Sequence, residues 1–176
     1  MQIHSEARIA HPRDRVFAAY RDQLCDLVPY LPDIKDIVVH DRKEEGSKVT
    51  LHNEWVADTE IPRAIRAIVR PEHLRWDDYA EWDEDAYSCA WHLKTRAFTD
   101  ALTCSGRNLF YDDGGSTRVV LTGELSLDLR RVRGVPRIGA RTMGTMLEKF
   151  VVAMITPNLQ RVNSALQPFL DAQGGA

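Results

Sequence analysis

Asn53 and Asp78 are the two residues whose chemical type and position in the sequence best suit ligand or proton chemistry. Each lies in a segment that alternates apolar and polar residues, Lys48–Ala57 and Leu74–Trp82 respectively, and each takes a position of the apolar set. In a strand such positions share one face. A buried amide or carboxylate is costly unless it is hydrogen-bonded, so we expect both side chains to hold the polar group of a ligand. A buried and unpaired Asp78 would have a raised pKa and act as a base near neutral pH.

Two structural interpretations of Asp78 stand beside this one. Its carboxylate pairs with an arginine such as Arg66, or it lies at the end of a strand. A shift of one residue in the strand register would instead turn Asp77 inward.

Other catalytic patterns are absent from the sequence. The histidines have no metal-ligand spacing, and His52-x-Glu54 offers only two ligands on the outward face, so we expect no metal site and no cofactor. No serine lies in a Gly-x-Ser-x-Gly context. The three cysteines lack Cys-x-x-Cys spacing, which predicts free thiols, with Cys89 and Cys104 inert and buried in strands.

Segments with a hydrophobic period of two must position these residues. Joined by short turns, they predict an antiparallel meander. The predicted strands are a first segment around Ile3–Ile9 and then Ile34–Arg42, Lys48–Ala57, Ala64–Val69, Leu74–Trp82, Ala86–Thr95, Ala101–Tyr111 and Thr117–Leu129.

Helical periodicity frames this meander. Pro12 suits the first turn of a short helix, and a second short helix is expected near Cys25–Val28. After Pro136 a long amphipathic helix is predicted, with an apolar stripe that includes Met143 and Leu147. Pro157 predicts a kink or a break near Ile155–Pro157.

Composition excludes several classes of protein. The chain has 176 residues, 44% of them hydrophobic, and a formal net charge of −3 that is too small and too mixed for a nucleic-acid binder. No apolar run is long enough to span a bilayer, and the N-terminal residues do not resemble a signal peptide. We expect one domain over residues 1–173, a disordered tail at 174–176, and a monomeric cytoplasmic protein.

The order of elements resembles that of the START-like superfamily, also called SRPBCC, which includes polyketide cyclases and lipid-transfer domains. The resemblance covers nearly the whole chain and rests on His11–Phe17, Val28–Pro32 and Ile155–Leu159. These patterns point to a fold and carry no catalytic signature. The resemblance implies an α+β helix-grip fold, in which a strongly curved antiparallel sheet of about seven strands surrounds a long C-terminal helix, with two short helices after the first strand.

In that superfamily the sheet and the helix enclose an elongated apolar cavity. The alternative is that the same inward side chains fill a solid core. If the cavity is present, strand parity and the helix stripe place nine ligand contacts in it: Asn53, Trp55, Trp76, Asp78, Tyr87, Trp91, Leu121, Phe150 and Met154.

The resemblance implies a protein that binds a hydrophobic small molecule, lipid-, polyketide- or quinone-like, as a carrier or sequestering protein rather than as an enzyme. The alternative is a polyketide cyclase/aromatase-type enzyme in which Asp78, with Tyr87, moves a proton. A third class is a non-catalytic partner within a larger complex. The basic residues Arg130, Arg131, Arg133, Arg137 and Arg141 form a solvated loop or make transient contact with a membrane surface.

Overall fold

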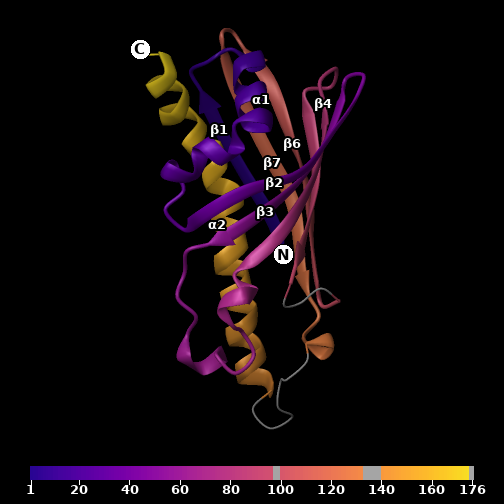
Figure 1. Ribbon diagram of the computed structural model, residues 1–176, viewed down its shortest axis with the longest axis vertical. Coiled ribbons are helices and arrows are strands. Elements are labelled where there is room, and N and C mark those ends of the chain that lie inside the picture. The colour runs from indigo at the N-terminus through magenta and orange to yellow at the C-terminus, as the bar shows by residue number, and fades with distance from the viewer. Residues whose placement is uncertain (97–99, 133–139, 175–176) are drawn as a thin grey trace.

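A computed structural model describes residues 1–96, 100–132 and 140–174 of the chain (Figure 1). The elements are β1 (Gln2–Ile9), α1 (Arg13–Asp22), the 3₁₀ helix η1 (Leu24–Tyr30), β2 (Ile34–Glu45), β3 (Lys48–Ala57), η2 (Arg63–Ile65), η3 (Pro71–His73), β4 (Arg75–Asp83), β5 (Ser88–Thr95), β6 (Leu102–Asp113), β7 (Ser116–Leu127), η4 (Leu129–Arg131) and α2 (Ala140–Gly174).

The seven strands form one antiparallel sheet in the order β1-β7-β6-β5-β4-β3-β2. Strands β2 to β7 follow one another as a meander, and β1 closes the far edge beside β7. This arrangement confirms the predicted α+β class and the antiparallel sheet of about seven strands. Figure 1 shows the sheet bending around α2, with α1 across one end.

Alternation along the strands separates the two faces of the sheet. In β3, Val49, Leu51, Asn53 and Trp55 are buried on the side of α2, whereas Thr50 and His52 point outward. Burial alternates in the same way along β4 and β5. The concave face therefore carries the core, as the period of two predicts.

Helix α2 is 35 residues long and continues through Pro157, so the predicted break does not occur. Pro157 cannot donate a backbone hydrogen bond. One turn of the helix is braced at this point by the Asn158 amide, which donates to the Met154 carbonyl at 2.7 Å. Leu147, Ile155 and other residues of the apolar stripe are fully buried against the sheet. Met143 is predicted to face inward, but its side chain is not among those that the structure describes. In the described residues, no helix combines the length and apolarity that a bilayer span requires.

The predicted strand Ala64–Val69 is wrong. Residues 58–74 connect β3 directly to its neighbour β4 and contain the two short 3₁₀ helices η2 and η3. Prolines precede or begin both, and local bonds such as Ile65 N–H to Pro62 O replace sheet pairing. Ile65 and Val69 are buried as expected, but Ala67 is exposed.

Candidate functional site

A small cavity lies between the concave face of the sheet and the middle of α2. Its volume is about 30 Å³, which is room for one or two water molecules. Its lining combines apolar, aromatic and polar side chains from α1, η1, the sheet and α2: Tyr20, Leu24, Asn53, Trp55, Asp78, Ala80, Trp82, Cys89, Trp91, Asn108, Leu159 and Val162.

Asn53 and Asp78 form the polar centre of this wall. They are direct partners across β3 and β4, and the Asn53 amide donates to Asp78 Oδ2 at 3.2 Å. Both residues are buried. None of the alternatives for Asp78 is found. The Arg66 Nε donates to the Ile61 carbonyl, Asp78 lies inside β4 and not at its end, and Asp77 points to the outer face.

Burial raises the pKa of Asp78 to about 6. The hydrogen bond from Asn53 opposes this shift, and so do the nearby Trp55 indole and the charge of His52. Desolvation outweighs them because no cation in the described part of the chain contacts Asp78. Near neutral pH both the acid and the base form of this carboxyl group are therefore populated.

Three further polar atoms of the lining are buried and make no hydrogen bond within the described parts of the chain. They are Asn53 Oδ1 and the indole nitrogens of Trp55 and Trp82. A buried donor or acceptor left unsatisfied costs about 1–3 kcal/mol. The wall thus presents two donors and one acceptor that water or a ligand can satisfy.

Trp91 lies across the inner face of the sheet over two glycines. A Cβ atom on Gly106 would lie 2.4 Å from the Trp91 ring and 2.3 Å from the Thr122 carbonyl, and one on Gly123 would lie 2.8 Å from that ring. The glycines therefore make room for the indole, whose N–H donates to Asn108 Oδ1 at 3.0 Å. This contact fixes the ring on one side of the cavity.

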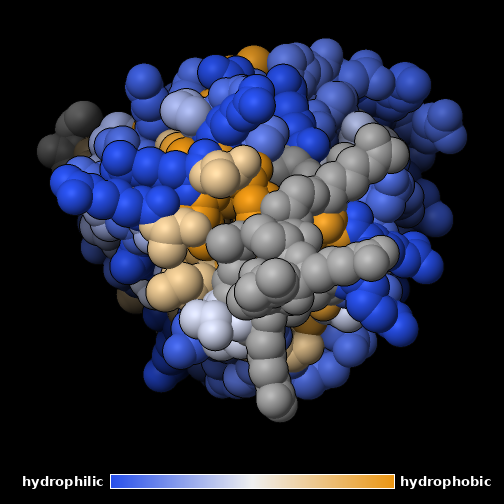
Figure 2. All heavy atoms as spheres, turned by 90° about the horizontal axis from the view of Figure 1, so that it is seen from below, coloured by the Kyte–Doolittle hydropathy of each residue, from blue (hydrophilic) through white to orange (hydrophobic). Residues whose placement is uncertain are grey.

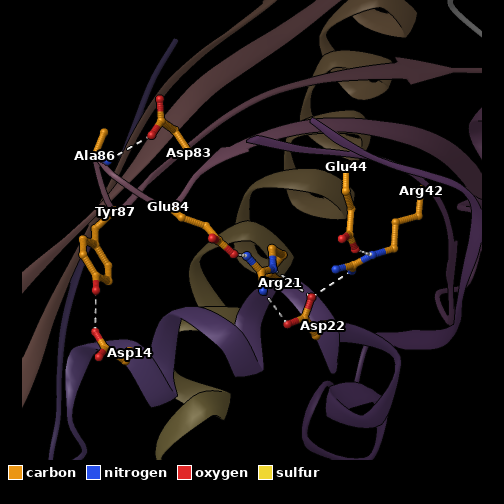
Figure 3. Close-up of polar contacts among 9 residues, drawn as sticks. All are labelled: Asp14, Arg21, Asp22, Arg42, Glu44, Asp83, Glu84, Ala86 and Tyr87. Carbon is orange, nitrogen blue, oxygen red and sulfur yellow. Dashed lines mark hydrogen bonds and ion pairs between the residues drawn. The ribbon is translucent and has the colours of Figure 1, made fainter. Parts of the chain in front are cut away.

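Helix α1 supplies Tyr20 to the cavity lining, and ion pairs attach this helix to two hairpins (Figure 3). Arg21 contacts Glu84 at the turn between β4 and β5, and Asp22 accepts from Arg42 of β2 at 2.8 Å. Burial raises the pKa of the Tyr20 hydroxyl, and the negative charge of Asp78 adds to this effect. Tyr20 therefore stays neutral and can only exchange hydrogen bonds.

Several solved structures share this architecture. The Thermus thermophilus protein TTHA0849 matches with a TM-score of 0.66 at 23% identity, over 98% of this chain and 99% of its own. The Zhui aromatase/cyclase from Streptomyces sp. R1128 matches with 0.63 at 16% identity, over 96% and 92%. Norcoclaurine synthase from Thalictrum flavum matches with 0.59 at 13% identity, over 97% and 86%. No family model and no curated protein matches the chain.

Each of these matches covers at least 96% of the chain, and they agree on the fold. The chain has the helix-grip fold that the resemblance implied. Identities this low establish the fold alone, and a shared fold does not imply a shared activity.

Four of the nine predicted contacts line the helix-grip cavity: Asn53, Trp55, Asp78 and Trp91. Trp76 is buried and stacks on Trp55 with ring centres 5.8 Å apart, outside the lining. Leu121, Phe150 and Met154 are buried in the surrounding core.

Tyr87 lies away from the cavity. It follows the β4–β5 turn with a positive φ of 46°, and its hydroxyl donates to Asp14 of α1 at 2.6 Å (Figure 3). Arg13 lies over its ring at 3.6 Å. The hydrogen bond to Asp14 raises the pKa of Tyr87. The geometry gives no support to the predicted proton transfer between Asp78 and Tyr87.

The outer face of the helix-grip sheet carries its own polar cluster. His52 contacts Asp77 at 2.8 Å and stacks on Tyr79 at 4.5 Å between ring centres. Glu54 is buried beneath Arg75 and Arg96 and receives a 3.0 Å contact from Arg75. His52 and Glu54 therefore share the outward face, as predicted. Within the described residues, no three side chains are arranged to hold a metal ion.

The predicted basic loop is described only in part. The Arg130 side chain makes two hydrogen bonds to Asp128, at 2.9 and 3.0 Å, and Arg131 also pairs with Asp128. Arg133, Arg137 and the side chain of Arg141 lie outside the described residues. Cys89 and Cys104 are buried and free, and burial raises the pKa of both thiols. The thiols therefore stay protonated, as expected of inert cysteines.

Sequence reasoning missed part of the lining as site residues, chiefly Tyr20, Asn108 and Leu159. Asn108 shares its strand face with Gly106, two positions away, and an isolated glycine in a strand signals close approach of another group. That signal could have identified the place of Trp91 and its acceptor. Nothing in the local pattern marks Tyr20 or Leu159, which reach the cavity only through the packing of α1 and α2.

Proposed function

We propose that this chain binds a small, mainly apolar molecule that carries at least one hydrogen-bonding group, in the interior between the sheet and α2. The observation that supports this proposal is the set of unsatisfied buried atoms on Asn53, Trp55 and Trp82 around one cavity. Apolar and aromatic walls with a few converging polar groups are typical of ligand sites. Lipid-, quinone- and polyketide-like molecules all fit this description, and the role would be carrying or sequestering the ligand.

Entry of such a ligand requires side chains to move. The cavity of about 30 Å³ is far below the 300–1,000 Å³ of ordinary ligand sites. Among the lining residues that the structure describes, Leu159 of α2 is partly exposed and the others are buried. Displacement of Leu159 would open the cavity on the side of α2.

The test compares two tryptophans. Calorimetric titrations with menadione, palmitate and emodin represent the three ligand classes. Trp82→Phe removes an unsatisfied indole N–H from the cavity, so the affinity for the probe that binds should fall about tenfold. Trp76→Phe removes an indole outside the lining and should leave the affinity within about twofold. Equal losses in the two variants, or no saturable binding of any probe, would contradict the proposal.

A cyclase-type enzyme is the second candidate, and the pKa of Asp78 near 6 favours it. The Asp78 carboxylate would take a proton from a carbon next to a ligand carbonyl. That carbon would then bond to a second carbonyl carbon, and the resulting alkoxide would take the proton back. Asp78→Asn should abolish ring closure of a poly-β-ketone while leaving its affinity within a few-fold. Unchanged product formation would exclude this role.

The proposal includes a role for the basic segment, which would contact a membrane surface during ligand transfer. Within its described part, Arg130 and Arg131 are exposed. Co-sedimentation with anionic liposomes at low salt, lost in Arg131→Ala, is the expected result. Equal sedimentation of the parent and the variant would contradict a role for this segment.

A further inference from the structure

Two hollows far larger than the interior cavity are lined by residues of the β3–β4 connection, which lies at the end opposite the C-terminus (bottom of Figure 1). One is bounded by residues 59–74 of the β3–β4 connection and has a volume of about 630 Å³. Figure 2 views this end and shows a group of apolar side chains that hydrophilic ones border on the outer side. In contrast to the interior cavity of about 30 Å³, the 59–74 hollow can take a ligand without rearrangement.

The lining of the 59–74 hollow combines an apolar floor with cationic sides. Val69 is fully buried, and Ile61 and Leu74 are partly buried. The charged residues of the lining are Arg66, Arg70 and Glu60. Thr59 and Pro71 complete it.

The two arginines are available to a ligand. Arg66 Nε donates to the Ile61 carbonyl at 3.0 Å, which orients the guanidinium, and its side chain has no ion pair in the described part of the chain. Arg70 contacts Glu72 at 3.8 Å, with side chains 69% and 61% exposed. An exposed contact of this length holds its partners only weakly.

A neighbouring hollow adds little to this positive charge. It has a volume of about 730 Å³, shares Thr59, Pro71 and Leu74 with the first, and adds Lys35, Arg75 and Arg96. Arg75 and Arg96 pair with Glu54, and Asp58 and Glu72 also line this hollow, so the cations that remain available at this end are chiefly Arg66 and Arg70 of the first hollow.

We propose that the 59–74 hollow binds an amphipathic anion, a molecule with one carboxylate or phosphate group and a short apolar body. The guanidinium groups of Arg66 and Arg70 match the planar or tetrahedral oxygens of the anion. Val69, Ile61 and Leu74 take the apolar body out of water. This site is separate from the interior cavity, and it does not depend on the function proposed for that cavity.

Three probes separate the two contributions. Decyl phosphate, below its micelle concentration, carries both the charge and the apolar body; inorganic phosphate carries only the charge, and decanol only the apolar body. In calorimetric titrations at low salt, decyl phosphate should bind at least tenfold more tightly than either of the others. Binding of decanol as tight as that of decyl phosphate would overturn the proposal.

Arginine variants locate the site. Arg66→Gln and Arg70→Gln should each weaken decyl phosphate binding at least tenfold. Arg63→Gln is the matched control, because Arg63 is exposed in the same connection and its replacement removes the same charge, but it does not line the hollow. The affinity of this control should stay within about twofold of the parent. An equal loss in all three variants would show long-range attraction without a site, and would overturn the proposal.

An interior variant distinguishes the two binding sites. Trp82→Phe should leave decyl phosphate binding unchanged, because Trp82 lines only the interior cavity of the two. If Trp82→Phe abolishes this binding and Arg66→Gln does not, the probe occupies the interior and the proposal fails. Failure of interior ligand binding alone leaves the expected arginine effects in place.

Discussion

Asp78 and Glu54 are two buried carboxyl groups on opposite faces of the same pair of strands. Glu54 lies on the outer face, with its side chain 8% exposed, and contacts Arg75, Arg96 and, at 3.8 Å, His40. Asp78 lies on the inner face, where the neutral Asn53 amide donates a hydrogen bond to its carboxyl group. The two groups thus differ in their partners far more than in their burial.

This difference separates a structural role from a chemical one. Two arginines neutralise Glu54 and connect the start of β4 and the end of β5 to β3. Asp78 has no cationic partner among the described residues, so burial raises its pKa from 3.8 to about 6, which corresponds to about 3 kcal/mol. A carboxyl group with this pKa at a cavity wall can donate or accept a proton near neutral pH.

The largest expected effect comes from making Glu54 resemble Asp78. The double variant Arg75→Met/Arg96→Met leaves a buried carboxylate without its cations, which should lower the free energy of unfolding by about 3–5 kcal/mol at pH 7. The unpaired carboxyl group should also bind its proton more tightly in the folded state, so stability should now fall as the pH rises. Urea denaturation at pH 5 and pH 8 measures both effects.

The control for this variant is Arg8→Met/Arg118→Met. These arginines pair with Asp113 and Glu6, whose side chains are 47% and 50% exposed. Such surface pairs contribute little, so the loss should stay below about 1 kcal/mol. If both double variants lose the same stability, burial of Glu54 does not depend on its arginines.

Asp78→Asn removes the loss of stability that comes from ionising a buried carboxyl group on the inner face of the sheet. Below about pH 3 the aspartate is protonated in the folded and unfolded states, and the two proteins should be equally stable. Between pH 4 and 6 the unfolded chain ionises first, because the folded pKa is raised, and the parent loses stability up to a plateau. Above pH 6 Asp78→Asn should therefore be more stable by up to about 3 kcal/mol, measured by urea denaturation across this range.

Asp77→Asn is the neighbouring control with the opposite sign. Asp77 points outward and contacts His52 at 2.8 Å, so its loss should destabilise the fold slightly near pH 6. A stability gain of Asp78→Asn that is the same at pH 4 as at pH 8 would contradict the raised pKa.

Strand parity was sufficient to place Asn53 and Asp78 inside and His52 and Glu54 outside. It works because side chains alternate strictly along a strand whose one face is buried. It failed over residues 64–69, where the same apolar spacing belongs to 3₁₀ turns between two prolines. It could not show that Glu54 is buried, because its cover comes from Arg75 and Arg96, which reach it across the strands.

The lining of the cavity depends on contacts between residues that are distant in sequence. Tyr20 arrives through the ion pairs of α1 with the β4–β5 turn, and Leu159 through the path of α2 over the sheet. Tyr87 shows the converse: its alternating position predicts an inward ring, but a positive φ after the turn directs it to Asp14. The fold was therefore predictable from pattern, and the site only where regular strands carry it.

The smallest expected effect concerns the electrostatic interaction between His52 on the outer face of the sheet and Asp78 on the inner face. The charge of His52 on the outer face lowers the pKa of Asp78 on the inner face. His52→Gln removes that charge and leaves Asp77 without its histidine, so both changes should raise the pKa of Asp78 further, with a stability change below about 1 kcal/mol. Carbon-detected NMR titration of the Asp78 carboxyl group measures this shift.

His92→Gln is the control for this variant. His92 stacks on the same Tyr79, with ring centres 5.0 Å apart, but it is not among the groups that shift the pKa of Asp78. An equal rise in both variants would mean that the two faces of the sheet do not communicate through His52.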